Sequence, residues 1–409
     1  MTALVPPDGR TLTPALAAVL VAQFFSALAD NALLFVAIAL LKTMQAPNWQ
    51  EPLLQEFFAL PFILLAPFVG PFADGWSKGR VMLLANAMKF AGTLAMLLGL
   101  HPLLAYGLVG AGAAAYSPAK YGILSELVSP ARLVQANSMM EGSTIVAILL
   151  GAVSGGMLAD WSVRAALAGV AVCYVIAALA NLMIPRLPPA HVLPTWSPSL
   201  LVGDFWLALV ALVKNRDARF SLIGTSLFWG SGSTLRFLLV AWVPVALHID
   251  DNGTAAKLSG VVGIGIALGA AAAAKFITLE NVQRALPAGI LIGLLIPLLA
   301  HGNSLLPTII LLVLIGICGG FYVVPLNALL QERGHETVGA GHAIAVQNAF
   351  ENLAMLVMVG IYALMTKAGL TVVTVATLFG IGVFVAMAAL AWTRIRGQGA
   401  GLAGATRER

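Results

Sequence analysis

Long apolar stretches dominate this sequence and restrict the folds that are open to it. Charged residues make up 10% of the 409 positions, against roughly 25% in ordinary soluble domains. A membrane-spanning helix needs about 20 mostly apolar residues, and Gly, Pro and charged residues divide the chain into twelve such stretches. The predicted spans are residues 15–41, 52–73, 81–100, 102–124, 134–159, 164–185, 219–247, 255–279, 284–300, 304–330, 339–366 and 371–393. We therefore predict an all-α membrane protein with twelve transmembrane helices.

Identical residues recur at a spacing of 206 positions, which is about half of the chain. The pairs are Gly110 and Gly316, Tyr116 and Tyr322, Leu124 and Leu330, and Glu126 and Glu332. The same step separates two opposite charges that lie inside apolar stretches, Asp30 and Arg236. This repeat predicts two pseudo-symmetric halves of six helices each.

The distribution of basic residues predicts the orientation of the chain in the membrane. With the N-terminus inside, sixteen of the 22 Lys and Arg lie on the cytoplasmic side, four lie outside, and Lys89 and Arg236 lie within spans. Cytoplasmic loops of membrane proteins carry such an excess, so both termini are predicted to be cytoplasmic. The same anchors explain the net charge of +5 without a nucleic-acid partner. A cleaved secretory signal ending near Ala29 is disfavoured, because the apolar run continues to Leu41.

Four segments follow from this pattern. They are an N-terminal half at 1–185, a cytoplasmic linker at 186–218, a C-terminal half at 219–396 and a tail at 397–409. Within the linker, Ser197 and Pro198 read as the start of a helix, and the stretch that follows is too short for a span, so we expect a helix on the cytoplasmic surface. The Gly-rich, charged tail is expected to be disordered.

Two six-span halves joined by a cytoplasmic linker resemble the layout of the major facilitator superfamily, whose substrate site lies near the bilayer midplane between the halves. The segment GPFADGWSKGR at 70–80 is similar to a loop signature of that superfamily, with a longer interval between its Asp and the following Gly. The resemblance implies that Asp74 latches the cytoplasmic ends of the halves together, and the predicted latch residues are Asp74, Lys78, Arg80 and Arg132. Lys120 and Arg132 are the candidate partners of Asp74. A plain cytoplasmic turn is the alternative.

Two small-residue motifs predict close helix packing. They comprise Gly151, Gly155 and Gly156 in the fifth span and Gly265 and Gly269 in the eighth. Spans at these places line the seam between the halves in this fold, so the glycines are predicted at a seam that opens sideways. Ordinary packing within one half is the alternative.

Ionisable residues inside predicted spans are the main candidates for a functional role. A charge at the centre of a membrane helix costs about 2.5 to 3.5 kcal/mol on insertion scales, so each such residue needs a partner, a cavity or a task. Asp30 and Arg236 lie near the middle of the first helix of each half, and Glu351 lies near the middle of the eleventh span. We predict that they face a central cavity, with a structural ion pair as the alternative.

Two lysines inside predicted spans are harder to place. Lys89 is expected to snorkel to the cytoplasmic interface from a peripheral third span. Lys120 lies near the cytoplasmic end of the fourth span beside Tyr121. It is predicted either to meet an anionic headgroup on the exit side, together with Tyr121, or to pair with Asp74.

Four strings in this sequence closely resemble the bacterial lysophospholipid transporter family of the major facilitator superfamily. They are VAQFFSALADNALLF, GAAAYSPAKYGILSEL, GTSLFWGSGSTLRFLLVAWVPVAL and VVPLNALLQERGHETVGAGHAIAVQN. The resemblance covers nearly the whole chain. It implies a flippase that moves lysophosphatidylethanolamine, with lysophosphatidylglycerol as a further candidate, from the outer to the inner leaflet of the bacterial inner membrane. A separate acyltransferase then remakes the diacyl lipid.

The implied substrate fits the ionisable residues. Guanidinium binds phosphate through a fork of donors, so Arg236 is predicted to bind the phosphate, and Asp30 or Glu351 the ammonium group. Asn31, Gln347 and Asn348 are predicted to hydrogen-bond the glycerol hydroxyl. The two cysteines, Cys173 and Cys318, indicate neither a disulfide framework nor a metal site. No cofactor is expected, membrane lipid is the expected surrounding partner, and the chain is expected to be a monomer.

Two other classes of function are weighed against this one. A proton-coupled exporter of small amphiphilic molecules has the same fold, but such exporters usually carry an Arg in the fourth span, and PLLAYGLVGAGAAAYSPAKYG has none. An enzyme is disfavoured, because the acyltransferase signature His-x-x-x-x-Asp fails at all six His. The chain also lacks a His-Glu-x-x-His zinc site and a P-loop.

Overall fold

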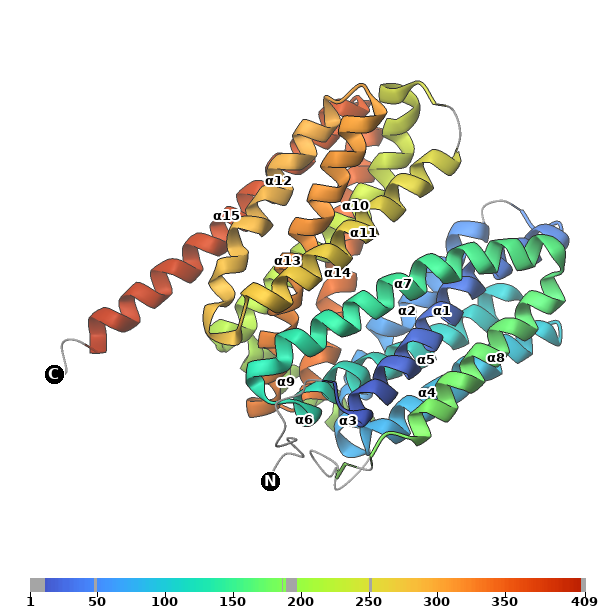
Figure 1. The fold of residues 1–409 in the computed structure, drawn as a ribbon, viewed down its shortest axis with the longest axis horizontal. Helices are drawn as coiled ribbons and strands as arrows, with labels where there is room; N and C mark the ends of the chain where they lie inside the picture. The colour runs from blue at the N-terminus through green and yellow to red at the C-terminus, as the bar shows by residue number, and fades with distance from the viewer. Residues whose placement is uncertain (1–11, 48–49, 186, 189–196, 250–251, 406–409) are drawn as a thin grey trace. The chain divides into compact units, whose positions relative to one another are not determined.

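The computed structural model describes residues 12–47, 50–185, 187–188, 197–249 and 252–405, and these residues fold into helices joined by short turns (Figure 1). The α-helices are α1 (Pro14–Thr43), α2 (Gln50–Leu64), α3 (Ala66–Gly75), α4 (Lys78–Leu97), α5 (Pro102–Gly122), α6 (Leu124–Leu127), α7 (Leu133–Trp161), α8 (Val163–Leu182), α9 (Pro198–Lys214), α10 (Arg216–Leu247), α11 (Asn252–Phe276), α12 (Leu286–Ala300), α13 (Leu305–Thr337), α14 (Ala340–Lys367) and α15 (Val372–Ala405). Two short 3-10 helices cover Pro130–Arg132 and Leu279–Ala285.

Each predicted span corresponds to a helix or to a bent pair of helices. Ten helical segments in the described part of the chain are long and apolar enough to cross a membrane, or eleven if α2 and α3, bent by 64°, form one broken span. The helix at the predicted span 102–124 is α5, which lies outside this set although it has 21 residues. The number twelve is therefore not confirmed, because small and polar residues dilute the hydropathy of α5.

Local sequence explains where several helices begin and end. Pro14 occupies the first turn of α1, and the hydroxyl of Thr13 accepts a hydrogen bond from the Leu16 amide at 3.1 Å, which caps the helix. Gly99 follows α4 with a φ of 99°, and Gly339 separates α13 from α14 with a φ of 96°. Glycine adopts this left-handed conformation without a steric penalty, so both helices end at these positions.

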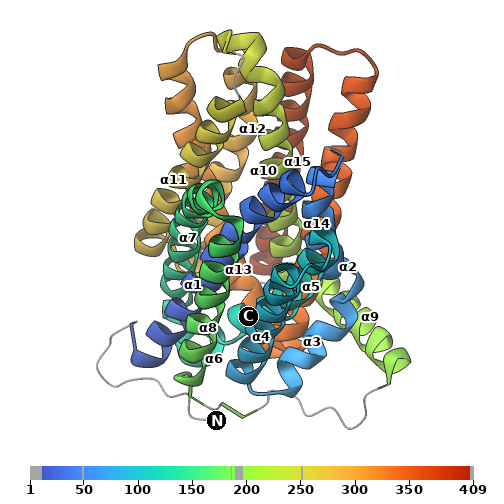
Figure 2. The same cartoon turned by 90° about the vertical axis from the view of Figure 1, so that its right-hand side faces the viewer.

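The linker contains the predicted additional helix, α9. Pro198 is its first residue, although the Ser197 side chain makes no capping hydrogen bond. Its buried residues are Leu201, Ala208 and Leu212, which lie on one face of a helix, and α9 packs against α3 (Figure 2). With 17 residues, α9 is shorter than the spans of the described chain.

The chain divides into two compact units. The first unit comprises Met1–Asn215 and Leu330–Ala349, and the second comprises Arg216–Leu329 and Phe350–Arg409. In the first unit α1 packs against α7 and α8, and α4 packs against α5 and α8. In the second unit α10 and α12 both pack against α15. The segment Leu330–Ala349 thus groups with the first unit, unlike the predicted boundaries.

One close contact repeats at the 206-residue spacing. A Cβ on Gly110 would lie 2.4 Å from the carbonyl oxygen of Phe58, and a Cβ on Gly316 would lie 2.3 Å from that of Val262. These contacts join α5 to α2 and α13 to α11, each within its own unit. A glycine is required at both places because two helix backbones approach closely.

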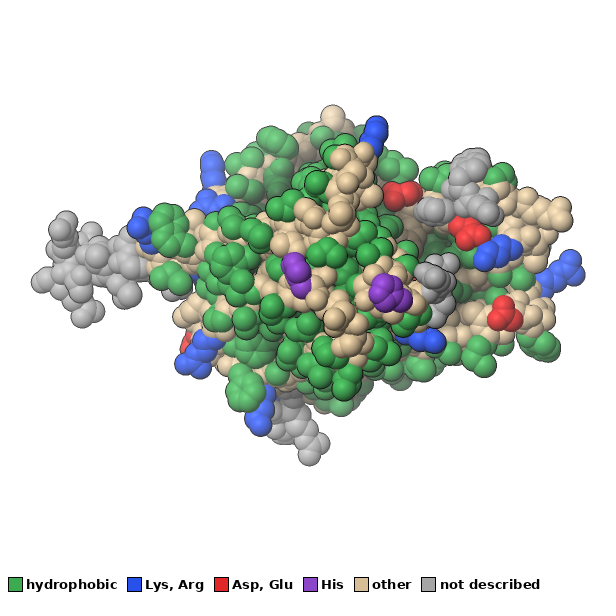
Figure 3. Space-filling view, turned by 90° about the horizontal axis from the view of Figure 1, so that it is seen from above, with side chains coloured by type: hydrophobic (Ala, Val, Ile, Leu, Met, Phe, Trp, Pro, Cys, Tyr) green, Lys and Arg blue, Asp and Glu red, His purple; other side chains and the backbone are tan. Residues whose placement is uncertain are grey.

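The surface is that of a protein that faces lipid. Large hydrophobic residues are exposed on most of the long helices, among them Leu150, Val240 and Leu356. In Figure 3, hydrophobic side chains cover much of the face shown, with a few Lys, Arg, Asp and Glu side chains scattered over it. Exposed apolar surface of this extent is expected where lipid replaces water.

The C-terminal helix is longer than the sequence predicts. Helix α15 continues to Ala405, so the expectation of disorder from residue 397 is wrong for 397–405. No proline interrupts this segment, and the glycines in it lower helix stability by about 1 kcal/mol each without preventing a helix. The remaining predicted tail residues, 406–409, lie outside the described residues.

Candidate functional site

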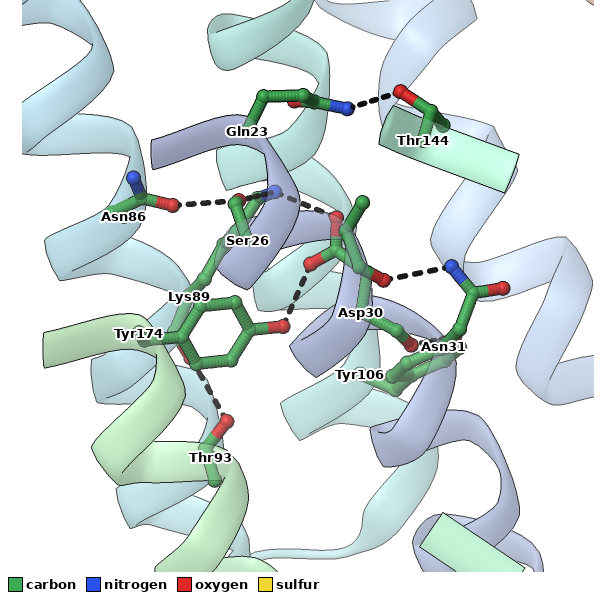
Figure 4. Close-up of polar contacts among 11 residues, drawn as sticks. Gln23, Ser26, Asp30, Asn31, Asn86, Lys89, Thr93, Tyr106, Thr144 and Tyr174 are labelled. Carbon is green, nitrogen blue, oxygen red and sulfur yellow. Dashed lines mark hydrogen bonds and ion pairs between the residues drawn. The ribbon is translucent and has the colours of Figure 1, made fainter. Parts of the chain in front are cut away.

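Asp30 lies in a polar cluster inside the first unit (Figure 4). The Nζ of Lys89 on α4 is 2.7 Å from the Oδ2 of Asp30, and the hydroxyl of Tyr174 on α8 donates to its Oδ1 at 2.7 Å. The Asp30 side chain keeps an exposed fraction of 18%. Three helices therefore hold this carboxylate, and part of it remains accessible.

The expectation that Lys89 snorkels to the interface is wrong. Lys89 is buried with an exposed fraction of 1%, and its ammonium group also donates to the Ser26 hydroxyl at 3.0 Å. The ring of Tyr116 lies beneath it, with the centroid 4.8 Å from Nζ, in a cation–π contact. A carboxylate, a hydroxyl and an aromatic face thus replace the water that the interface would provide.

The cluster extends along one face of α1. Ser26 donates to the Oδ1 of Asn86 at 2.8 Å, and the amide of Gln23 donates to the Thr144 hydroxyl at 2.9 Å (Figure 4). Gln23, Ser26 and Asp30 are spaced by three and four residues, which places them on one side of a helix. The sequence analysis missed the role of Gln23, Ser26 and Asn86, and this spacing is the signal that was available.

The side chain of Asn31 forms its hydrogen bond within its own helix. Its side-chain amide donates to the carbonyl oxygen of Ala27 on the same helix at 2.8 Å. Local bonds of this type are common for Asn within helices. A role for Asn31 in binding a glycerol hydroxyl stays a prediction.

Arg236 and Glu351 belong to the second unit. Arg236 on α10 is an exposed residue, and its guanidinium makes no hydrogen bond or ion pair to any residue in the described ranges. Glu351 on α14 is buried. An exposed guanidinium near the middle of a long apolar helix is costly, which makes Arg236 the strongest candidate for binding an anionic ligand.

The remaining predicted headgroup residues lie in the first unit. The Asn348 amide donates to the Ser117 hydroxyl on α5 at 2.9 Å, and Gln347 is buried. The Lys120 ammonium lies 4.1 Å from the centroid of the Tyr121 ring. The Tyr121 hydroxyl donates to the Oε1 of Glu141 at 2.6 Å. Glu141, a buried carboxylate on α7, was missed by the sequence analysis.

Asp74 is the centre of a second buried cluster, at the end of the unit that is predicted to be cytoplasmic. Its Oδ1 accepts from the backbone amide of Gly341 at 2.8 Å. Its Oδ2 lies 2.9 Å from the amide nitrogen of His342 and 2.8 Å from the Nδ1 of the same residue. The carboxylate therefore caps the N-terminus of α14, where the amide groups and the helix dipole favour a negative charge.

The two predicted ion-pair partners of Asp74 are replaced by another lysine. Lys78 lies one helical turn away, with its Nζ 3.5 Å from the Oδ1 of Asp74, and it also pairs with Glu126. Lys120 contacts the Tyr121 ring instead, and Arg132 is half-buried without an ion pair in the described chain. Arg80 is exposed. The backbone amides hold Asp74 in a defined position, because they are fixed by the helix that they begin.

A reciprocal pair of amides joins α7 to the end of α13. Asn137 donates to Gln331 at 2.9 Å, and Gln331 donates to Asn137 at 2.7 Å. Both side chains are fully buried. Amide pairs of this kind satisfy two donors and two acceptors at once, so they fix the register of the two helices.

The glycine motifs pack within single units. A Cβ on Gly151 or Gly155 would lie 2.5 to 2.6 Å from backbone atoms of α1, and a Cβ on Gly265 or Gly269 would lie 2.0 to 2.4 Å from carbonyl oxygens of α13. Nothing lies within 4 Å of the position for Gly156. The close contacts of four glycines thus match the packing alternative, and their placement at a seam stays a prediction.

Comparison with known proteins places this chain in a family. Residues 19–359, most of the chain, match the sequence profile of the Major Facilitator Superfamily. The chain belongs to this superfamily. It is therefore a multi-pass membrane protein, as its apolar helices indicate.

Related proteins of known name support a narrower grouping. The chain is 57% identical over 368 residues to a protein of Yersinia pestis (strain Pestoides F) named "Lysophospholipid transporter LplT", covering 90% of this chain and 91% of that protein. The proteins of that name from Yersinia pseudotuberculosis serotype IB (strain PB1/+) and serotype I (strain IP32953) match to the same extent. The resemblance seen in the sequence is confirmed.

Solved structures of other superfamily members share the fold. The transporter FucP in its outward conformation aligns with a TM-score of 0.75 at 13% identity, covering 94% of this chain and 99% of that one. The human organic anion transporter MFSD10 aligns with a TM-score of 0.73 at 18% identity, covering 94% and 100%. At these identities the similarity shows the fold alone.

Proposed function

We propose that this chain is a lysophospholipid transporter that moves lysophosphatidylethanolamine and related lysolipids from the outer to the inner leaflet of the bacterial inner membrane. The observation that carries the proposal is the 57% identity, over nine-tenths of the chain, to proteins named as lysophospholipid transporters. A separate acyltransferase would consume the product by restoring the second acyl chain. The transporter itself is expected to act as a monomer.

The proposed orientation places both termini in the cytoplasm. It rests on the excess of Lys and Arg in the loops assigned to that side. In this orientation the Asp74 cluster and the Asn137–Gln331 pair lie at the cytoplasmic end of the helices. Asp74 then acts as a latch through the start of α14, which is a different contact from the charge pair that the loop signature implied.

The headgroup chemistry fits the exposed guanidinium. A lysophosphatidylethanolamine headgroup carries one phosphate and one ammonium group, and both must leave water during the crossing. Arg236 supplies a fork of donors for the phosphate, and it makes no competing ion pair within the described ranges. Binding would offset the cost of desolvating the phosphate.

The ammonium group is proposed to bind Asp30 or Glu351. Asp30 already faces Lys89 and Tyr174, so a bound ammonium would share the carboxylate with Lys89. Asn31, Gln347 and Asn348 are proposed to contact the glycerol hydroxyl, and Lys120 with Tyr121 to contact the headgroup on its way out. We also propose that Asp30 and Glu351 bind the same headgroup as Arg236.

Reconstitution tests substrate and site together. Purified protein in vesicles is given fluorescent lysophosphatidylethanolamine, and its appearance in the opposite leaflet is followed with and without an ion gradient. We expect Arg236→Ala to abolish movement and Arg236→Lys to lose most of it, because an ammonium group lacks the fork of donors. Arg164, an exposed residue at the start of α8, provides the control Arg164→Ala, which should move lysolipid at the wild-type rate.

The outcomes separate the site from the substrate. Wild-type rates for both Arg236 variants would refute the phosphate site, and no movement of lysolipid by the wild-type protein would refute the function. Movement that requires a proton gradient would show coupling, which the exporter alternative predicts.

A further inference from the structure

A pocket of about 410 Å³ opens in the second unit, between the first residues of α10 and the last residues of the span formed by α15. Arg216 and Arg219 line it from α10, and Arg394 lines it from α15. These two helices pack against each other. The pocket is therefore built from two neighbouring helices of one unit, at one end of their apolar segments.

The charge of the pocket favours an anion. Its lining contains three guanidinium groups and one carboxylate, Asp217, which leaves a net charge of +2 at neutral pH. Asp217 pairs with Arg394. The Nε of Arg394 is buried and has no hydrogen-bond partner in the described residues. A phosphate oxygen is a suitable acceptor for such a donor.

The lining also contains apolar side chains, which favour a lipid over a free ion. Phe220, Ile223 and Leu390, together with Thr393, complete the walls. The ring of Phe220 lies beneath Arg394, with its centroid 5.0 Å from the guanidinium carbon, and Ile223 is 41% exposed. The basic groups thus adjoin an exposed side chain on the flank of a predicted span.

The neighbouring residues mark the membrane surface. Trp392 is 55% exposed, and the guanidinium carbon of Arg396 lies 3.9 Å from the centroid of its ring. Exposed Trp and Arg side chains gather where the apolar core of a bilayer meets the headgroups. The pocket therefore lies at headgroup level, where basic pockets between membrane helices bind anionic lipids.

We propose that this pocket binds the phosphate of an anionic phospholipid, such as phosphatidylglycerol. The leaflet follows from the orientation given under the proposed function, which makes it the cytoplasmic one. The bound lipid would neutralise the excess guanidinium charge and hold the end of α10 to α15. Arg216 precedes Arg236 by twenty residues on the same helix, which is about 30 Å at the rise of an α-helix. The pocket is thus separate from the proposed headgroup site.

Thermal unfolding of the purified full-length protein in a neutral detergent tests the proposal. Phosphatidylglycerol, phosphatidylcholine and inorganic phosphate are added separately to the wild-type protein, to Arg216→Gln/Arg219→Gln and to Arg284→Gln. Arg284 is an exposed basic residue of the same unit outside the pocket, so its variant controls for a simple loss of charge. The double variant retains Arg394 and its pair with Asp217, which protects the fold.

We expect phosphatidylglycerol to raise the unfolding temperature of the wild-type protein and of Arg284→Gln by several degrees. The double variant should lose most of this shift, and added salt should weaken it. An equal shift with phosphatidylcholine, or with the double variant, would overturn the proposal. An equal shift with inorganic phosphate would show a site for small anions instead of a lipid. Because the measurement reports binding and not transport, its failure leaves the proposed function untouched.

Discussion

The ammonium group of Lys89 lies 2.7 Å from the carboxylate of Asp30, inside the first unit. Two charges that the sequence places in different apolar stretches therefore neutralise each other. Tyr174 and Ser26 add hydrogen bonds to the same pair. The pair joins α1 to α4 and holds the Asp30 carboxylate in place, with 18% of its side chain exposed.

Removal of Lys89 should destabilise the protein, because it leaves the Asp30 carboxylate without its counter-ion. We expect Lys89→Met to destabilise the protein by about 3 kcal/mol, the lower end of the range for breaking a buried pair, because Asp30 is partly exposed. The double variant Asp30→Asn/Lys89→Met should recover part of that loss, since no lone charge remains. Thermal unfolding of the purified variants measures both effects. Equal losses in the single and double variants would contradict the pair as an energetic unit.

Removal of the Asp74 carboxylate should release the start of α14. Asp74→Ala takes an acceptor from the amides of Gly341 and His342 and a partner from Lys78. Loss of a helix cap costs about 0.5 to 2 kcal/mol, and the buried Lys78 adds to this. Unfolding experiments and lysolipid movement should both show the loss. Arg80 lies nearby in the first turn of α4 but is exposed. Arg80→Ala should stay within about 0.5 kcal/mol of wild type, and a similar loss there would argue against a specific cap.

Adjacent glycines in α7 should respond differently to alanine. A methyl group on Gly155 meets the backbone of Ala32 at 2.6 Å, whereas one on Gly156 meets nothing within 4 Å. We expect Gly155→Ala to cost about 1 to 3 kcal/mol, the usual penalty for overpacking, and Gly156→Ala to be neutral. Unfolding temperatures of the two variants decide the matter. Equal tolerance at both positions would mean that α7 does not pack closely on α1.

The Asn137–Gln331 pair should show coupling in a double-mutant cycle. Each single alanine variant leaves the other buried amide without its partner, while the double variant removes both. Coupling between polar side chains in membrane helices averages about 0.6 kcal/mol and reaches about 1.7, and a reciprocal pair is expected in the upper part of that range. Unfolding free energies of the four proteins give the coupling. Additive losses would show that the two amides act independently.

The positions of the helices are predictable from sequence because bilayer thickness fixes their length. The predicted limits of the first span, 15–41, differ by two residues or fewer from those of α1, Pro14–Thr43. At the predicted span 102–124 the helix α5 forms, but glycine, tyrosine and proline lower its hydropathy, so it is not confirmed as a span. The prediction failed at 397–405, where composition favours a coil but α15 continues.

The site is less predictable, because contacts depend on how helices are rotated about their axes. Hydropathy placed Lys89 in the third span but gave no sign that α4 turns it towards Asp30. Two of the groups that contact Asp74 are the backbone amides of residues 341 and 342, and a backbone amide has no signature in the side-chain sequence. Gly155 and Gly156 look equivalent in a motif, yet one residue along a helix turns by about 100°, so only one of them meets α1.

The separation of Asp30 and Lys89 along the chain has a consequence for biosynthesis. The carboxylate leaves the ribosome 59 residues before its counter-ion, which corresponds to about 3 to 12 s at ordinary rates of translation. During that interval the first helix enters the membrane with a lone acidic group, so its apolar residues must offset the insertion cost without help. The Asp30 carboxylate gains its counter-ion only when the segment that forms α4 reaches the membrane.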